Sequence, residues 1–115
     1  MTVLKLMGPW PVLVMAGLLE VTWAVGLKAS DGFKRPVASS VTVIAMIGSL
    51  YLLALALREL PVSTGYAVWT GIGALGTAIV GMAFLGEPRS ALRVASILLI
   101  VAGIIGLRVA TGARG

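Results

Sequence analysis

Long apolar segments separated by charged residues are the main feature of this chain. Two segments, 36–57 and 60–86, contain no charged residue, and a third, 6–27, contains only Glu20. A fourth segment, 94–107, is shorter and has an arginine at each end. The hydrocarbon core of a bilayer takes about 20 apolar residues per helix. The pattern therefore predicts an all-α membrane protein with four transmembrane helices. They are expected near residues 9–28, 36–58, 61–85 and 90–109.

Turn-forming residues separate these helices. Residues 30–32 (Ser-Asp-Gly) predict a turn, Pro61 is expected to open the third helix, and residues 86–88 (Gly-Glu-Pro) break the chain again. Ser90 is a candidate N-cap for the fourth helix, and residues 111–115 are expected to form a frayed tail. Such short connections make consecutive helices antiparallel neighbours. We therefore expect residues 1–115 to be a single transmembrane domain, with no room for a soluble one.

Composition narrows the chemistry that the chain can perform. It is 59% hydrophobic and 11% charged, against roughly a quarter charged in a soluble domain. Its net charge of +5 comes from basic residues that stand singly or in pairs at the ends of apolar segments, so no nucleic-acid partner is expected. Cysteine and histidine are absent, which excludes thiolate metal sites and histidine proton shuttles. We expect no cofactor and no metal, and proton chemistry must use carboxylates.

The basic residues also bear on orientation in the membrane. The positive-inside rule orients a protein through an excess of Lys and Arg on one side. Four basic residues fall on the side of the termini and middle loop, and five on the other, which is almost no excess. The sequence predicts insertion in both orientations, which permits an antiparallel homodimer; the alternative is that one weak charge or an insertion partner decides. The first side carries Lys5, Arg58, Arg108 and Arg114, and the second carries Lys28, Lys34, Arg35, Arg89 and Arg93.

Glu20 is the candidate functional residue because it is the only acidic residue inside a predicted span. A charged group at that depth costs several kcal/mol and usually faces a cavity or a partner. One interpretation is a structural carboxyl group hydrogen-bonded to another helix. The other is a binding site for a cation, a proton or both. Burial and a second carboxylate nearby both favour the protonated carboxyl, which can release its proton when a cation arrives and recover it when the cation leaves.

Three aromatic residues and a serine are candidates for the surroundings of Glu20. Trp23 lies three residues after Glu20 on the same helical face, where its indole N–H can donate to a carboxylate. Tyr66 and Trp69 share a face of the third helix and could form the walls of a cation site. Ser49, near the middle of the second helix, is a further possible donor. The alternative for the aromatic residues is an interfacial belt, and a serine in such a helix can simply bond its own backbone.

Glycines in the third helix form a G-x-G-x-x-G pattern at Gly71, Gly73 and Gly76. A dinucleotide site is excluded because no strand precedes the pattern and no acidic ribose ligand follows it. Clustered glycines instead allow a helix to bend and to pack closely. We therefore expect Gly71 and Gly73 to form a hinge.

The fourth helix carries small residues on one stripe. Ser96, Ile100 and Gly103 lie at helical spacing, and small residues let another membrane helix approach closely. The stripe is a candidate dimer contact, although small residues are frequent in membrane helices generally.

Taken together, these residues resemble the small multidrug resistance family of proton-coupled cation exporters. The resemblance covers residues 12–109 and depends on four motifs. They are GLLEVTWAVGLK (17–28), SDGF (30–33), LPVSTGYAVWTGIG (60–73) and AGIIGLR (102–108). Within the family the chain looks like the guanidinium exporter (Gdx) subtype, because exporters of polyaromatic cations typically have glycine where Trp23 stands.

The resemblance implies a role for each candidate residue. Glu20 would be the shared proton and substrate carboxylate, paired with its copy from the second subunit of an antiparallel, dual-topology homodimer. Trp23 and Ser49 would order it by hydrogen bonds, Tyr66 would switch partners as access changes, and Trp69 would form a wall of the pocket. Gly71 and Gly73 would be the hinge, and the stripe at Ser96, Ile100 and Gly103 the dimer contact.

The predicted function is guanidinium/H+ exchange across the inner (cytoplasmic) membrane. Guanidinium and protons would be the transported ions, and the lipid bilayer and a second copy of the chain the partners. Two alternatives stay open: an exporter of broader quaternary or aromatic cations, and a non-transporting membrane subunit. An enzyme is not expected, since one buried carboxylate without a nucleophile–base pair offers little chemistry.

Overall fold

The computed structural model describes residues 8–113, which form four long α-helices and, within that range, no strand. The helices have 21 to 23 residues each, about 32–35 Å at a rise of 1.5 Å per residue. Each is long and apolar enough to cross a membrane, so the predicted all-α fold with four transmembrane helices is confirmed. They are α2 (Pro9–Ala29), α3 (Pro36–Ala56), α4 (Val62–Phe84) and α5 (Ala91–Ala113). The basic residues Lys5 and Arg114 lie outside the described residues.

The turn between α2 and α3 forms where the sequence predicts it. The Ser30 hydroxyl donates to the Leu27 carbonyl at 2.7 Å and accepts from the Phe33 backbone N–H at 3.1 Å. Asp31, Gly32 and Phe33 all have positive φ angles, so the chain reverses through three consecutive left-handed residues. Pro36 then starts α3 in its first turn, where a missing N–H costs nothing.

Helix α3 is shorter than the predicted 36–58. It ends at Ala56, after which Arg58 and Glu59 make tight bonds to carbonyls three residues back, each at 3.1 Å. Proline disfavours the helical conformation in the residue before it. Pro61 therefore separates the two helices, and it lies just outside α4 as its N-cap rather than inside the helix.

The last helix is longer than predicted. Its expected end near residue 109 is wrong, because α5 continues to Ala113, and the expected frayed tail is helical at 111–113. No proline or glycine interrupts residues 107–111, so nothing local stops the helical hydrogen bonding there. At its other end α5 begins at Ala91, and the Ser90 hydroxyl accepts from the Arg93 backbone N–H at 3.2 Å. The predicted cap at Ser90 is confirmed.

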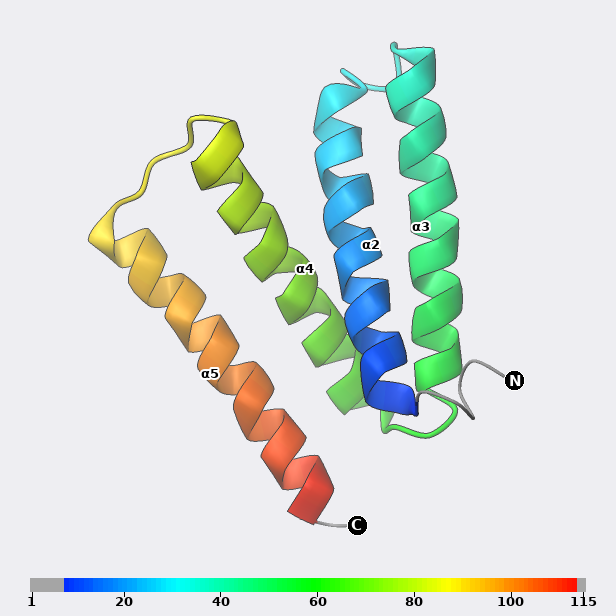
Figure 1. The fold of residues 1–115 in the computed structure, drawn as a ribbon, viewed down its shortest axis with the longest axis vertical. Helices are drawn as coiled ribbons and strands as arrows, with labels where there is room; N and C mark the ends of the chain where they lie inside the picture. Colours follow the sequence, from blue (N-terminus) through cyan, green and yellow to red (C-terminus); the bar gives the residue numbers. More distant parts are fainter. Residues whose placement is uncertain (1–7, 114–115) are drawn as a thin grey trace.

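The four helices are packed unequally (Figure 1). α2 packs against both α3 and α4, whereas α5 packs mainly on α4 and lies at the edge of the molecule. The α2–α3 and α4–α5 connections lie at one end and the α3–α4 connection at the other, as consecutive antiparallel helices require. None of the described α5 side chains (91–111) is fully buried.

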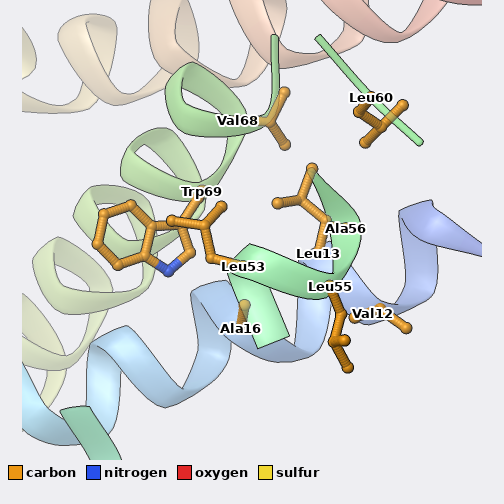
Figure 2. Close-up of a cluster of buried hydrophobic side chains, with 9 residues drawn as sticks. All are labelled: Val12, Leu13, Ala16, Leu53, Leu55, Ala56, Leu60, Val68 and Trp69. Carbon is orange, nitrogen blue, oxygen red and sulfur yellow. The ribbon is translucent and has the colours of Figure 1, made fainter. Parts of the chain in front are cut away.

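The hydrophobic core lies at the end of the molecule where α2 begins, α3 ends and α4 begins (Figure 2). Buried side chains of these three helices and of Leu60 converge there, and the partly buried Ile104 and Leu107 of α5 pack against them. This packing fixes the first half of α2 relative to α4, directly before Glu20 in the chain. The cluster consists of Val12, Leu13, Ala16, Leu53, Leu55, Ala56, Leu60, Val68 and Trp69.

Candidate functional site

Glu20 lies midway along α2, on the side that faces α4. The side chain is half-buried, and its Oε1 atom is fully buried without a hydrogen-bond partner among the described residues. The carboxylate rests directly on Gly73 of α4. An unpaired acceptor in such a position is costly unless a proton, a cation or another polar group satisfies it.

A hydrogen-bonded bridge joins three helices one turn from Glu20. The Ser49 hydroxyl of α3 donates to the Ala16 carbonyl of α2 at 2.6 Å and accepts from the Trp69 indole N–H of α4 at 3.0 Å. Ser49 is fully buried, and Trp69 is only 7% exposed. Ala16 precedes Glu20 by four residues and so shares its helical face. The bridge therefore fixes α2, α3 and α4 relative to one another beside the carboxylate.

Trp23 and Tyr66 differ in how exposed their side chains are. The Trp23 side chain is half-buried, and its Nε1 is a buried donor without a partner among the described residues. Tyr66 is 56% exposed, and its ring lies 5.7 Å from the ring of Trp69, centroid to centroid, at an interplanar angle of 42°. The chain thus offers one unused donor on α2 and one accessible aromatic ring on α4.

Only some of the contacts predicted around Glu20 occur within the single chain. The structure joins Ser49 and Trp69 by a hydrogen bond and places the ring of Tyr66, tilted, beside that of Trp69. A hydroxyl has one proton to donate, and Ser49 gives it to Ala16 rather than to Glu20. Hydrogen bonds from Trp23, Ser49 or Tyr66 to the carboxylate stay predictions.

The two glycines predicted as a hinge lie within the uninterrupted helix α4. They face different neighbours. Gly71 faces α5, where an added Cβ would lie 3.0 Å from Cδ1 of Ile104, whereas Gly73 faces Glu20 on α2. A bend at this point stays a prediction.

The α5 stripe predicted as a dimer contact lies beside the boundary between α5 and α4. Ser96 and Gly103 are exposed and Ile100 is half-buried against Gly71. A Cβ added at Gly103 would meet no atom of this chain within 4 Å. The stripe is thus open to another helix, and its role in a dimer stays a prediction.

Two features of the structure were missed by sequence reasoning. The first is the contact between Gly73 and Glu20, together with a second glycine contact in which Gly17 packs on Ile72 of α4. The pattern of small residues at facing positions could have indicated this close approach. The second is the Arg108 guanidinium, which lies 4.8 Å from the ring centre of Trp10 and joins the C-terminal part of α5 to the start of α2. No spacing rule relates residues so distant in the chain.

No group of three or more His, Cys, Asp or Glu side chains that could hold a metal ion occurs in residues 8–113. The other acidic residues of the chain, Asp31, Glu59 and Glu87, lie in the connections between helices. Glu20 is consequently the one carboxylate within the membrane-spanning segments. Fold and site together define a small multi-pass membrane protein built around one intramembrane carboxylate.

Comparison with known proteins identifies the family within this class. The family model described as Small Multidrug Resistance protein matches residues 8–100. The chain belongs to this family and is a multi-pass protein of the inner membrane.

Similar proteins are found in enterobacteria. The chain is 58% identical over 102 residues to a protein of Yersinia pseudotuberculosis named Guanidinium exporter, covering 89% of this chain and 98% of that one. Proteins of the same name from Escherichia coli O6:H1 and Escherichia coli K12 are 61% and 60% identical, each over 89% of this chain and 97% of the relative. The resemblance inferred from the sequence motifs is confirmed.

Proposed function

We propose that this protein is a proton-coupled antiporter that exports guanidinium across the inner membrane. The single observation that carries the proposal is the Glu20 carboxylate, which lies in a transmembrane helix with a buried, unpaired oxygen. The similar proteins named Guanidinium exporter support the choice of cation. Their names are those of transporters, which also supports a role other than that of an enzyme.

The chemistry of the cation suits such a carboxylate. Guanidinium is planar, and N–H groups along its edges can pair with both carboxylate oxygens at once. A proton and the cation compete for the same oxygens, so binding of one releases the other. Exchange follows if the site opens to only one side of the membrane at a time. Trp23 has an unused indole N–H that can order the carboxylate, and Tyr66 is free to change partners during the switch.

The working unit proposed is an antiparallel homodimer. One chain supplies only one Glu20, while its helix α5 is unburied and the face of Tyr66 is open. A second copy inserted in the opposite orientation would bring a second carboxylate to the same site. The balanced Lys and Arg distribution supports insertion in both orientations. A C-terminal reporter that is active on one side of the membrane tests this: activity from both sides is expected, and a single fixed orientation would contradict it.

The transport proposal is tested with purified protein in liposomes. Proton-coupled current or acidification is measured after adding guanidinium and, separately, tetrapropylammonium. A response to guanidinium without a comparable response to the quaternary cation is expected, since tetrapropylammonium has no N–H to donate. The opposite preference would indicate an exporter of broader cations. No response to either cation would favour a non-transporting subunit.

Substitution of Trp23 tests the choice between guanidinium and broader cations. Replacing the bulky indole by Trp23→Gly should enlarge the site and raise the response to tetrapropylammonium relative to guanidinium. The ratio of the two responses is the measurement, because it is independent of the amount of protein reconstituted. An unchanged ratio would remove Trp23 from the site.

A further inference from the structure

The contact between Glu20 and Gly73 leaves no space for a side chain on α4. A Cβ built on Gly73 would lie 2.8 Å from Cγ of Glu20 and closer still to the carboxylate carbon and Oε1. Real Cβ atoms essentially never approach another atom within 3.0 Å. Gly73 is itself buried. Any residue other than glycine at this position therefore displaces the Glu20 side chain or pushes α4 away from α2.

Two neighbouring glycines of α4 separate close helix packing from contact with the carboxylate. Gly76, one turn further along α4, faces α2 as well, but an added Cβ there would meet the apolar side chain of Val21. Gly71, two residues before Gly73, faces α5 and would meet Ile104. All three glycines could serve packing or bending of α4. Only Gly73 contacts the carboxylate.

The backbone contact also determines what the carboxylate can bind. Oε1 lies against a glycine Cα, which offers neither a donor nor a charge, and no described residue hydrogen-bonds it. The oxygen is held in place yet keeps its acceptor capacity for a proton or an N–H group. A binding group must be held within about 0.5 Å of its productive position to be effective. Backbone of a packed helix provides such a fixed surface, whereas a long side chain in the same place would not.

We propose that Gly73 is a positioning residue for Glu20: the missing side chain lets the carboxylate rest on the α4 backbone with its oxygen free for the exchanged ion. The proposal deepens the proposed antiport function and rests on it for the identity of that ion. It differs from a hinge, because the requirement at Gly73 is space for Glu20 rather than flexibility of α4. The two roles predict different results for the neighbouring glycines.

The test compares three alanine substitutions in the full-length protein in liposomes. Gly73→Ala should lower guanidinium-driven proton flux by at least about tenfold, since displacements near 1 Å in a binding site have effects of that order or larger. Gly76→Ala is the control for packing of α4 on α2, and Gly71→Ala is the control for bending. Both should lose less flux than Gly73→Ala, because their added methyl groups meet Val21 and Ile104 rather than the carboxylate. Equal losses in all three variants would overturn the proposal in favour of a hinge or a general packing role.

A shorter acidic side chain provides the rescue experiment. Aspartate carries its carboxyl group one methylene, about 1.5 Å, closer to the α2 backbone than glutamate does. In a Glu20→Asp background, Gly73→Ala should therefore cost much less than it does in the wild type, which a double-mutant cycle measures as coupling. Additive losses would contradict the proposal. If Gly73→Ala alone fails to yield a folded protein, recovery of folding in the Glu20→Asp background supports the proposal, and no recovery overturns it.

A readout independent of transport separates this proposal from the proposed function. The chain has three glutamates, Glu20, Glu59 and Glu87, so carboxyl-labelled glutamate gives three NMR signals to follow during a pH titration. The midpoint of the Glu20 signal should move more in Gly73→Ala than in Gly76→Ala, because only the first substitution meets the carboxylate. An unchanged titration midpoint of Glu20 in Gly73→Ala would contradict the positioning role even if transport is lost. If the Glu20 midpoint moves in Gly73→Ala but the wild-type protein does not respond to guanidinium, the transport proposal alone is contradicted.

Discussion

The two faces of α4 differ in how closely they meet the neighbouring helices. Toward α2, Gly73 and Gly76 lie so near Glu20 and Val21 that an added methyl group would overlap their side chains. Toward α5, the two helices enclose an apolar groove of about 610 Å³ that begins at Tyr66. On the side toward α2, the backbone of α4 is therefore in direct contact with side chains of its neighbour. On the side toward α5, a groove separates parts of the two helices.

This difference separates two requirements of a transporter. The carboxylate needs a fixed position, and the α2–α4 contact together with the Ser49 bridge provides it. A change of access needs a surface that can be rearranged or covered by another chain. The α4–α5 groove and the exposed side chains of α5 have that property. Substitutions on the two faces should accordingly fail in different ways.

The largest effect is expected on the packed face, at Glu20 itself. Glu20→Gln keeps the size of the side chain but removes its ability to exchange a proton for a cation. Guanidinium-driven proton flux should be abolished in liposomes. Glu59→Gln is the matched control, because Glu59 is an exposed residue of the α3–α4 connection and should leave the flux unchanged. Substrate-driven proton flux that persists in Glu20→Gln would refute the mechanism.

The next largest effect is expected at the α4–α5 groove, at Gly103 of α5. The single chain has space for a side chain there, since nothing lies within 4 Å of an added Cβ. Gly103→Leu should therefore leave the fold of one chain intact and weaken association of two. Cross-linking and the molecular mass in detergent measure the dimer fraction, with Ile105→Leu at an exposed α5 position as the control. A variant that remains fully dimeric would exclude this stripe as the contact.

Loss of the Ser49 hydroxyl should have a moderate effect on the packed face. Ser49→Ala removes the bridge between the Ala16 carbonyl and the Trp69 indole and leaves the buried Trp69 N–H unpaired. Unsatisfied buried groups cost about 1–3 kcal/mol each. Thermal unfolding in detergent should show the loss. Ser40→Ala is the control, since its exposed hydroxyl bonds only the Pro36 carbonyl of its own helix, and equal stability of the two variants would show that the bridge contributes nothing.

The smallest effect is expected at the far end of α4. Arg89 donates from Nε and Nη2 to the Met82 carbonyl, at 3.0 and 2.8 Å, and so caps the end of the helix. Arg89→Ala should lower stability by about 0.3–1 kcal/mol, the range for an exposed cation at a helix C-terminus. The same thermal measurement applies, with transport expected to be unchanged. A loss of transport would show that the α4–α5 connection influences the site at Glu20.

Much of the fold could be predicted because membrane helices follow from charge and turn residues alone. The absence of charge in 36–57 and 60–86 located two spans, and Pro36, Pro61 and Ser90 located helix starts to within a residue. Helix ends were less certain. The end of α5 was placed too early because a weakly polar sequence such as 109–113 continues a helix as readily as it leaves one.

The sequence proposes a set of candidate site residues but not their geometry. Helical offsets placed Trp23 near Glu20, and Tyr66 near Trp69, because these pairs lie on one helix. Contacts between helices depend on their rotation and approach, which no local pattern determines. The Ser49 bridge to Ala16 and the contact of Gly73 with Glu20 both belong to that second kind. The glycines were consequently interpreted as flexibility rather than as space.

One measurement tests most directly the central claim that a single carboxylate serves both the proton and the cation. Purified protein in weakly buffered detergent solution near neutral pH is mixed with guanidinium, and the released protons are counted. The wild-type protein should release protons on binding, in proportion to the site occupied. Glu20→Gln should release none. Proton release from Glu20→Gln equal to that of the wild type would contradict the shared site and place the exchange on another group.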